Sequence, residues 1–109
     1  MAKSLGHEKY ICLSLINRAN ALWRLGRYPE AKEDLKQAAA TAEQPEASRG
    51  ISSWFSLVLA RMLLSERRLP DAKLKSRQTL VLAGTQLKGT VAEATYTLGL
   101  AETFSNAVR

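Results

Sequence analysis

Cysteine, histidine, proline and glycine are all scarce in this sequence, and each shortage excludes a class of structure or chemistry. The single cysteine, Cys12, excludes an internal disulfide and any metal site built from cysteines alone. The single histidine, His7, stands at no defined spacing from Cys12 that indicates a nucleophile and its base. Three prolines and six glycines among 109 residues disfavour long irregular segments. We therefore expect neither catalysis nor a bound metal.

Long hydrophobic runs are absent as well. The longest apolar stretches are far shorter than the ~20 residues that a membrane-spanning helix requires. The N-terminal segment MAKSLGHEKY lacks the apolar centre of a signal peptide. A lone cysteine is compatible with a reducing compartment. We therefore expect a cytoplasmic protein without membrane contacts.

The abundant residues favour helix. Ala, Leu, Arg, Lys and Glu are frequent, whereas β-branched residues are sparse and scattered. Strand propensity is notable only at residues 79–82, which have no other strand to pair with. A length of 109 residues and a hydrophobic content of 46% suit one packed domain. The sequence therefore predicts a single all-α domain over residues 1–109.

Apolar residues recur at the three- and four-residue spacing of a helix face in five segments. These segments cover approximately residues 7–25, 29–43, 47–66, 70–83 and 89–108. Gly26 can take the left-handed conformation that ends a helix, and Pro29 suits the first turn of the next helix. The corner at residues 66–68 has no glycine and is less clearly marked. The last segment carries the apolar stripe Val91, Ala94, Leu98, Ala101, Phe104 and Val108.

The segments repeat at a constant interval of 41 residues, as Ala19, Ala60 and Ala101 illustrate. Other pairs at this interval are Pro29 with Pro70, Ala31 with Ala72, Lys32 with Lys73, Gln37 with Gln78, and Ala42 with Ala83. A fixed period of helix–turn–helix units is typical of an α-solenoid, in which stacked hairpins bury each other's apolar faces. We expect two repeats, at about residues 7–44 and 47–84, followed by a half repeat or capping helix at about 89–108.

These positions resemble the tetratricopeptide repeat (TPR) family. The residues that carry the resemblance are Ala19, Leu22, Gly26, Tyr28, Ala31 and Ala38 in the first repeat, and Ala60, Leu63, Leu69, Ala72 and Thr79 in the second. The interval of 41 residues exceeds the family's usual period of about 34, and it is similar to the longer-helix variants in MalT-type transcription regulators and kinesin light chains. In the third copy, Leu98 and Gly99 can instead supply the family's Leu–Gly pair, which shifts the register by two residues; Phe104 favours the Ala101 alignment.

The resemblance implies a protein-interaction module, acting as a scaffold or regulatory part of a larger protein, whose first helices line a concave groove. The groove positions carried over from the family are Leu13, Asn17, Asn20, Arg24, Trp54, Val58, Arg61, Ser65, Thr95, Glu102 and Asn106. Asn and Arg side chains can hold an extended peptide through its backbone and acidic groups; the alternative is that these are ordinary solvated or inter-repeat positions. The family's carboxylate clamp for chaperone C-termini is disfavoured. Asn20 matches it, but Ile16 and Val58 replace its lysine and second asparagine.

Two other functions remain open on the sequence. Val91, Leu98 and Phe104 suggest homo-oligomerisation through the last helix. The net charge of +6 and a basic rim suggest weak phosphate or nucleic-acid binding, the rim residues being Arg24, Arg27, Arg67, Arg68, Lys73 and Arg77. No aromatic residues interleave with these cations, which disfavours nucleic acid. We interpret Trp23 and Trp54 as core or groove-edge residues, and residues 84–89 lack the order of a phosphate loop, so no cofactor is expected.

Overall fold

The computed structural model describes residues 5–44, 47–84 and 87–107, and over these residues the chain forms five α-helices and no strand. The helices are α1 (Leu5–Arg24), α2 (Tyr28–Ala42), α3 (Arg49–Ser65), α4 (Leu69–Ala83) and α5 (Lys88–Ala107). The prediction of an all-α fold is confirmed, and residues 79–82 lie inside α4. The largest differences in bounds are two residues: α1 begins before its predicted start at residue 7, and α3 begins after its predicted start at residue 47. Ser48 caps this helix, since its side-chain oxygen accepts the Ile51 N–H at 3.2 Å.

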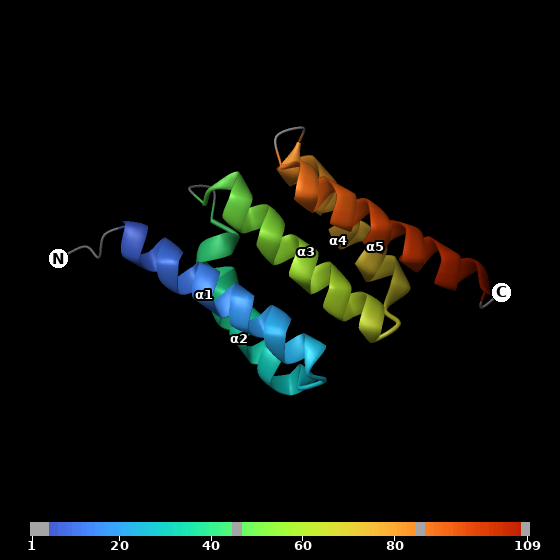
Figure 1. The fold of residues 1–109 in the computed structure, drawn as a ribbon, viewed down its shortest axis with the longest axis horizontal. Coiled ribbons are helices and arrows are strands. Elements are labelled where there is room, and N and C mark those ends of the chain that lie inside the picture. The colour runs from blue at the N-terminus through green and yellow to red at the C-terminus, as the bar shows by residue number, and fades with distance from the viewer. Residues whose placement is uncertain (1–4, 45–46, 85–86, 108–109) are drawn as a thin grey trace.

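The helices form two layers. Figure 1 shows α1, α3 and α5 side by side in the nearer layer, with α2 and α4 behind them. Successive helices are in contact all along the chain, and α1–α3 and α3–α5 contacts join the nearer layer. The described structure measures 55 × 32 × 19 Å, and its shortest dimension equals about two helix diameters of ~10 Å.

The interval of 41 residues recurs in the helix bounds. The bounds of α2 and α4 are offset by this interval at both ends, and so are the C-terminal ends of α1 and α3. Buried residues recur with it: Cys12 with Ser53, Ala19 with Ala60, Ala31 with Ala72, Leu35 with Ser76, Ala38 with Thr79, and Ala42 with Ala83. Small side chains at many of these positions let neighbouring helices approach closely.

Two apolar clusters hold the layers together. The first joins α1, α2 and α3 and consists of Cys12, Ile16, Ala19, Ala31, Leu35, Ala38, Ala42, Phe55, Val58 and Met62. The second joins α3, α4 and α5 and consists of Leu63, Leu64, Leu69, Ala72 and Ala101. Leu59 packs against both clusters, so α3 is the helix around which the fold is built.

The apolar stripe of α5 packs against α3 and α4. Ala94, Thr97 and Ala101 are buried, and Phe104 packs against the second cluster. Val91 and Leu98 are half-buried, and Val108 lies outside the described residues. The stripe that suggested homo-oligomerisation is therefore largely covered within one chain.

Candidate functional site: a hollow between α1, α3 and α5

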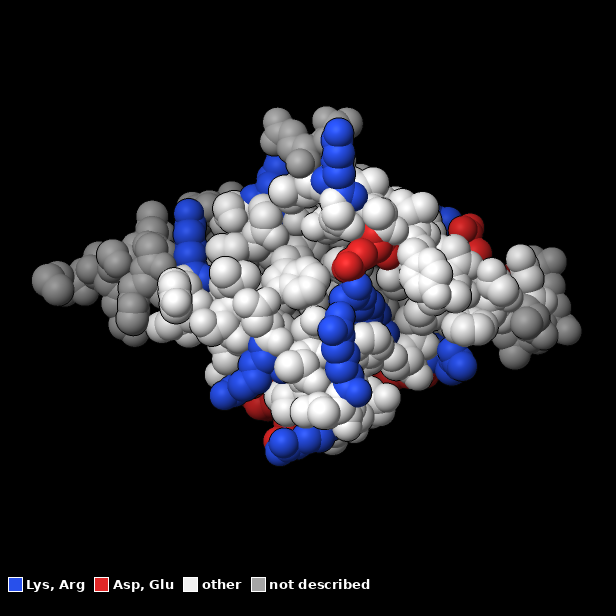
Figure 2. All heavy atoms as spheres, viewed as in Figure 1, with Lys and Arg blue, Asp and Glu red and all other residues white. Residues whose placement is uncertain are grey.

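A hollow of about 440 Å³ opens between α1, α3 and α5. Its lining residues are Trp23, Arg24, Arg61, Leu64, Ala92, Glu93, Tyr96, Thr97 and Leu100. The face of the molecule on which these helices lie is largely uncharged, with cationic and acidic side chains meeting near its centre (Figure 2). A volume of this size is within the range of protein ligand sites.

Arg61 joins the three helices around the hollow. Its Nη1 donates to Oδ1 of Asn20 on α1 at 3.4 Å, and its Nη2 donates to the Glu93 carboxylate on α5. The guanidinium carbon lies 5.9 Å from the centroid of the Trp54 ring. Only 15% of the Arg61 side chain is exposed. Arg61 is therefore held on several sides and is a fixed part of the hollow.

Two indole N–H groups tie α1 to α3 beside Arg61. Trp54 Nε1 donates to Oδ1 of Asn17 at 2.8 Å, and Trp23 Nε1 donates to Oγ of Ser65 at 2.7 Å. Ser65 Oγ in turn donates to the Arg61 carbonyl at 3.1 Å. The side-chain oxygens of the predicted groove residues Asn17, Asn20 and Ser65 thus accept hydrogen bonds from neighbouring helices, as the inter-repeat interpretation expects.

The part of the hollow that remains accessible is mostly apolar. Tyr96 is 69% exposed. Trp23, Leu64 and Leu100 are partly or largely buried beside it. Arg24, in the last turn of α1, is exposed and forms no ion pair with a carboxylate of the described residues. The hollow thus offers an apolar surface with an available guanidinium beside it.

Five of the predicted groove residues lie elsewhere. Val58 is completely buried in the first cluster and does not line a groove, which corrects its assignment. Leu13 is exposed on α1 outside the hollow. Thr95, Glu102 and Asn106 are exposed on another side of α5, where Glu102 lies 3.8 Å from Arg77 of α4.

The orientation of α5 explains why the transferred positions miss the hollow. Ala19 lies in one cluster with Ala31 of the helix that follows α1, but Ala101 lies with Leu69 and Ala72 of the helix that precedes α5. The lining positions Glu93 and Leu100 stand two residues before Thr95 and Glu102. Two residues correspond to about 200° around an α-helix. The alternative register based on the Leu–Gly pair shifts α5 by the same two residues, so this signal pointed to Glu93 and Leu100.

Seven lining residues were not among the predicted groove positions: Trp23, Leu64, Ala92, Glu93, Tyr96, Thr97 and Leu100. Of these seven residues, only Trp23 was interpreted from the sequence as a core or groove-edge residue. The others follow from the rotation of α5 and from the packing of α3 against it, which depend on tertiary contacts.

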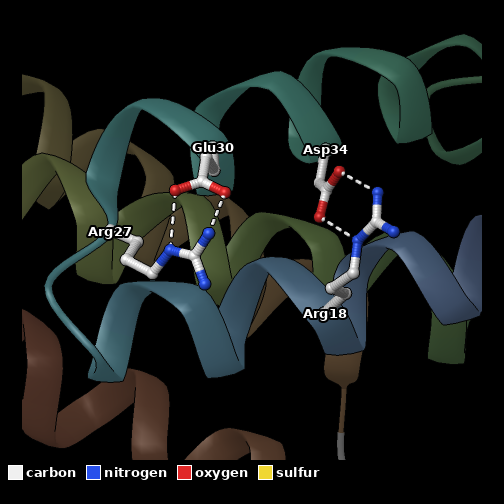
Figure 3. Close-up of polar contacts among 4 residues, drawn as sticks. All are labelled: Arg18, Arg27, Glu30 and Asp34. Carbon is white, nitrogen blue, oxygen red and sulfur yellow. Dashed lines mark hydrogen bonds and ion pairs between the residues drawn. The ribbon is translucent and has the colours of Figure 1, made fainter.

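Ion pairs occupy much of the basic rim. Arg27 pairs with Glu30 and Arg68 pairs with Asp71, each three residues into the following helix, and Arg77 lies near Glu102. The hydrogen bond from Arg27 to Glu30 raises the pKa of the Arg27 guanidinium. Figure 3 shows this pair beside a second one, in which Arg18 binds Asp34. Paired cations contribute less to phosphate binding, because an approaching phosphate has to compete with the carboxylate.

The Arg18–Asp34 pair joins α1 to α2. Arg18 Nε and Nη2 each donate to one Asp34 carboxylate oxygen at 2.7 Å (Figure 3). Asp34 is 3% exposed, whereas most of the Arg18 side chain is in solvent. The hydrogen bond to Asp34 raises the pKa of Arg18. The equivalent positions one repeat later are Leu59 and Lys75, so this pair belongs to the first hairpin only.

The described residues offer little for metal or thiol chemistry. Cys12 is buried, its thiol donates to the Ala38 carbonyl at 3.4 Å, and burial raises its pKa. No group of three or more His, Cys, Asp or Glu residues in the described part of the chain could hold a metal ion. Residues 85–86 of the loop-like segment 84–89 and the His7 side chain lie outside the described residues. None of the described helices combines the length and the apolar character needed to cross a membrane.

Comparison of the chain with protein-family models, curated proteins and solved structures gives no match. Function is therefore inferred from the helix arrangement and the hollow.

Proposed function

We propose that this chain is a TPR-like α-solenoid module that binds a protein or peptide partner in the hollow between α1, α3 and α5. The solenoid assignment is supported by the 41-residue offset of helix bounds and buried positions. It is supported further by the two-layer arrangement, in which alternate helices share a layer (Figure 1). Solenoids of this type use the surface formed by equivalent helices of successive repeats for binding.

The observation that carries the proposed binding function is an exposed tyrosine in a hollow whose accessible surface is mostly apolar. Tyr96 is 69% exposed beside Trp23, Leu64 and Leu100. Tyrosine and tryptophan are the residues on which binding energy concentrates in protein interfaces, because they offer large contact areas with few rotatable bonds. The polar ties around Arg61 fix the spacing of the three helices, so a partner meets a largely preformed surface.

Peptide selection on the intact chain tests this function. A random peptide library displayed on phage is selected against the immobilised protein, and enriched peptides are measured by calorimetry against wild type, Tyr96→Ala and Tyr10→Ala. Tyr10 is a matched control, since it is 74% exposed on α1 and does not line the hollow. We expect Tyr96→Ala to weaken binding about tenfold or more and Tyr10→Ala to change it less than about twofold. Recovery of no peptide, or equal effects of the two variants, would contradict the proposal.

A further inference from the structure

We infer that the occupant of the hollow is an acidic peptide segment that presents an apolar side chain to Tyr96 and Leu100 and an adjacent carboxylate to Arg24. This inference depends on the proposed function, because it specifies the chemistry of a partner for the same site.

The apolar half of the inference follows from the walls of the hollow. Trp23, Leu64, Tyr96 and Leu100 contribute hydrophobic surface from all three helices, and the hollow of about 440 Å³ is open to solvent. Covering Tyr96, the most exposed of these side chains, removes apolar area from water. An aliphatic or aromatic side chain is the complementary group.

The acidic half follows from the charges that line the hollow. Arg24, Arg61 and Glu93 are the charged lining residues. Arg61 and Glu93 pair with each other. Arg24 forms no ion pair with a carboxylate of the described residues, so Arg24 is the lining cation that is available to a ligand. A guanidinium binds a carboxylate through two parallel N–H···O bonds, which makes arginine selective for acidic groups. The net charge of +6 adds a long-range attraction for an acidic segment.

The same charge pattern favours a peptide over nucleic acid. Binding to a nucleic acid backbone requires several cations that contact successive phosphates. The hollow offers one available guanidinium, and three rim arginines, Arg27, Arg68 and Arg77, already lie beside carboxylates. One cation beside an apolar surface instead matches one carboxylate beside an apolar side chain.

Two synthetic peptide pools test the inference. Both consist of random hexapeptides with Leu or Phe at a central position; the residue that follows is Asp or Glu in the acidic pool and Asn or Gln in the amide pool. Binding to the full chain is followed by NMR of the indole N–H signals. The chain has two tryptophans, of which Trp23 lines the hollow and Trp54 does not. We expect the acidic pool to shift the Trp23 signal at about tenfold lower concentration than the amide pool does, and this preference to weaken with added salt.

Two variants and one control locate the preference. Arg24→Gln is expected to abolish the difference between the pools, whereas Arg49→Gln, which removes another exposed arginine outside the hollow, is expected to preserve it. Glu93→Gln releases Arg61 from its carboxylate and is expected to strengthen binding of the acidic pool. Circular dichroism of each variant verifies that the helices are intact.

The outcomes separate this inference from the proposed function. If both pools shift Trp23 equally and Arg24→Gln has no effect, the hollow binds peptides but the acidic preference is wrong. If the peptides selected on phage bind elsewhere and neither pool shifts Trp23, the proposed function fails and the inference fails with it.

Discussion

Gly26 and Arg67 occupy the same position in successive helix corners, 41 residues apart, and both have a positive φ angle, of 80° and 61° respectively. The hydrogen bonds around them match as well. The Arg27 N–H donates to the Leu22 carbonyl at 2.9 Å, and the Arg68 N–H donates to the Leu63 carbonyl at 3.0 Å. Both corners therefore have the backbone of a helix C-terminal cap, which usually has glycine at the left-handed position.

The second corner has a side chain where the first has none, and this difference can be measured. Left-handed backbone costs a residue with a Cβ atom roughly 1–2 kcal/mol. Arg67 also stacks on Phe104, with the guanidinium carbon 4.2 Å from the ring centroid. Because Arg67→Ala and Arg67→Gly both remove this contact, their comparison isolates the backbone term. We expect Arg67→Gly to be more stable than Arg67→Ala by about 1 kcal/mol in urea unfolding.

The first corner supplies the opposite substitution. A Cβ atom added to Gly26 would meet no other atom within 4 Å, so Gly26→Ala introduces backbone strain without a clash. It is expected to destabilise the protein by about 1 kcal/mol. Equal stabilities of Arg67→Gly and Arg67→Ala, together with a neutral Gly26→Ala, would show that the two corners do not share this conformation in solution.

The Arg18–Asp34 pair predicts that two acidic residues of α2, Asp34 and Glu30, contribute unequally to the free energy of unfolding. Asp34→Asn keeps the shape of the side chain but removes its negative charge and replaces one of the two oxygens that accept hydrogen bonds from Arg18 with an NH2 group (Figure 3). Because Asp34 is almost fully buried, we expect the free energy of unfolding to fall by about 1–2 kcal/mol. Glu30→Gln is the matched control. Glu30 is exposed and pairs with Arg27 across one helix turn, so a change within about 0.5 kcal/mol is expected. If Glu30→Gln lowers the free energy of unfolding as much as Asp34→Asn does, the buried carboxylate does not contribute more to stability than the exposed one.

Local signals made the helices predictable from the sequence. The apolar spacing, together with Gly26, Pro29 and Pro70, gave five helices with bounds within a few residues of those observed. Ala31, Leu35, Ala38 and Ala42 have this helical spacing, and all four are buried on α2. The left-handed conformation of Arg67 was not predicted, because no glycine marks this corner in the sequence.

The site was predictable only where the repeat continues. The transferred positions on α1 and α3 include residues that do line or border the hollow, such as Arg24, Arg61 and Ser65. The transfer failed on α5, because Ala101 packs against the preceding helix and turns Thr95, Glu102 and Asn106 away from the hollow. Asp34 was missed for another reason: a buried carboxylate has no signature in the apolar pattern when its partner is sixteen residues away.

The buried thiol predicts how stability depends on alkaline pH. Burial raises the pKa of Cys12 above its ordinary value of 9.0, so the folded protein holds the thiol proton more tightly than the unfolded chain does. The resulting contribution to stability is complete below the pKa of the unfolded thiol and is lost as pH rises through the folded value. Urea unfolding of wild type and Cys12→Ala between pH 7 and about pH 10 measures it, since other titrating groups cancel in the difference. Wild type should lose stability relative to Cys12→Ala as pH rises; a constant difference would contradict this.

The contacts of Arg61 predict that this residue stabilises the packing of α1, α3 and α5 and thereby maintains the hollow between them. Arg61→Gln breaks the pair with Glu93 on α5, and a glutamine is too short to maintain the contact with Asn20 on α1. Because the Arg61 side chain is 15% exposed, we expect the free energy of unfolding to fall by about 1–3 kcal/mol. Arg77→Gln serves as the control, since Arg77 is exposed and its Glu102 partner lies at 3.8 Å, beyond hydrogen-bonding distance. The indole N–H signal of Trp54, whose ring lies beside the Arg61 guanidinium, should shift in Arg61→Gln and stay in place in Arg77→Gln. If both variants unfold at the same urea concentration as wild type, Arg61 does not hold the helices together, and the hollow depends on apolar packing alone.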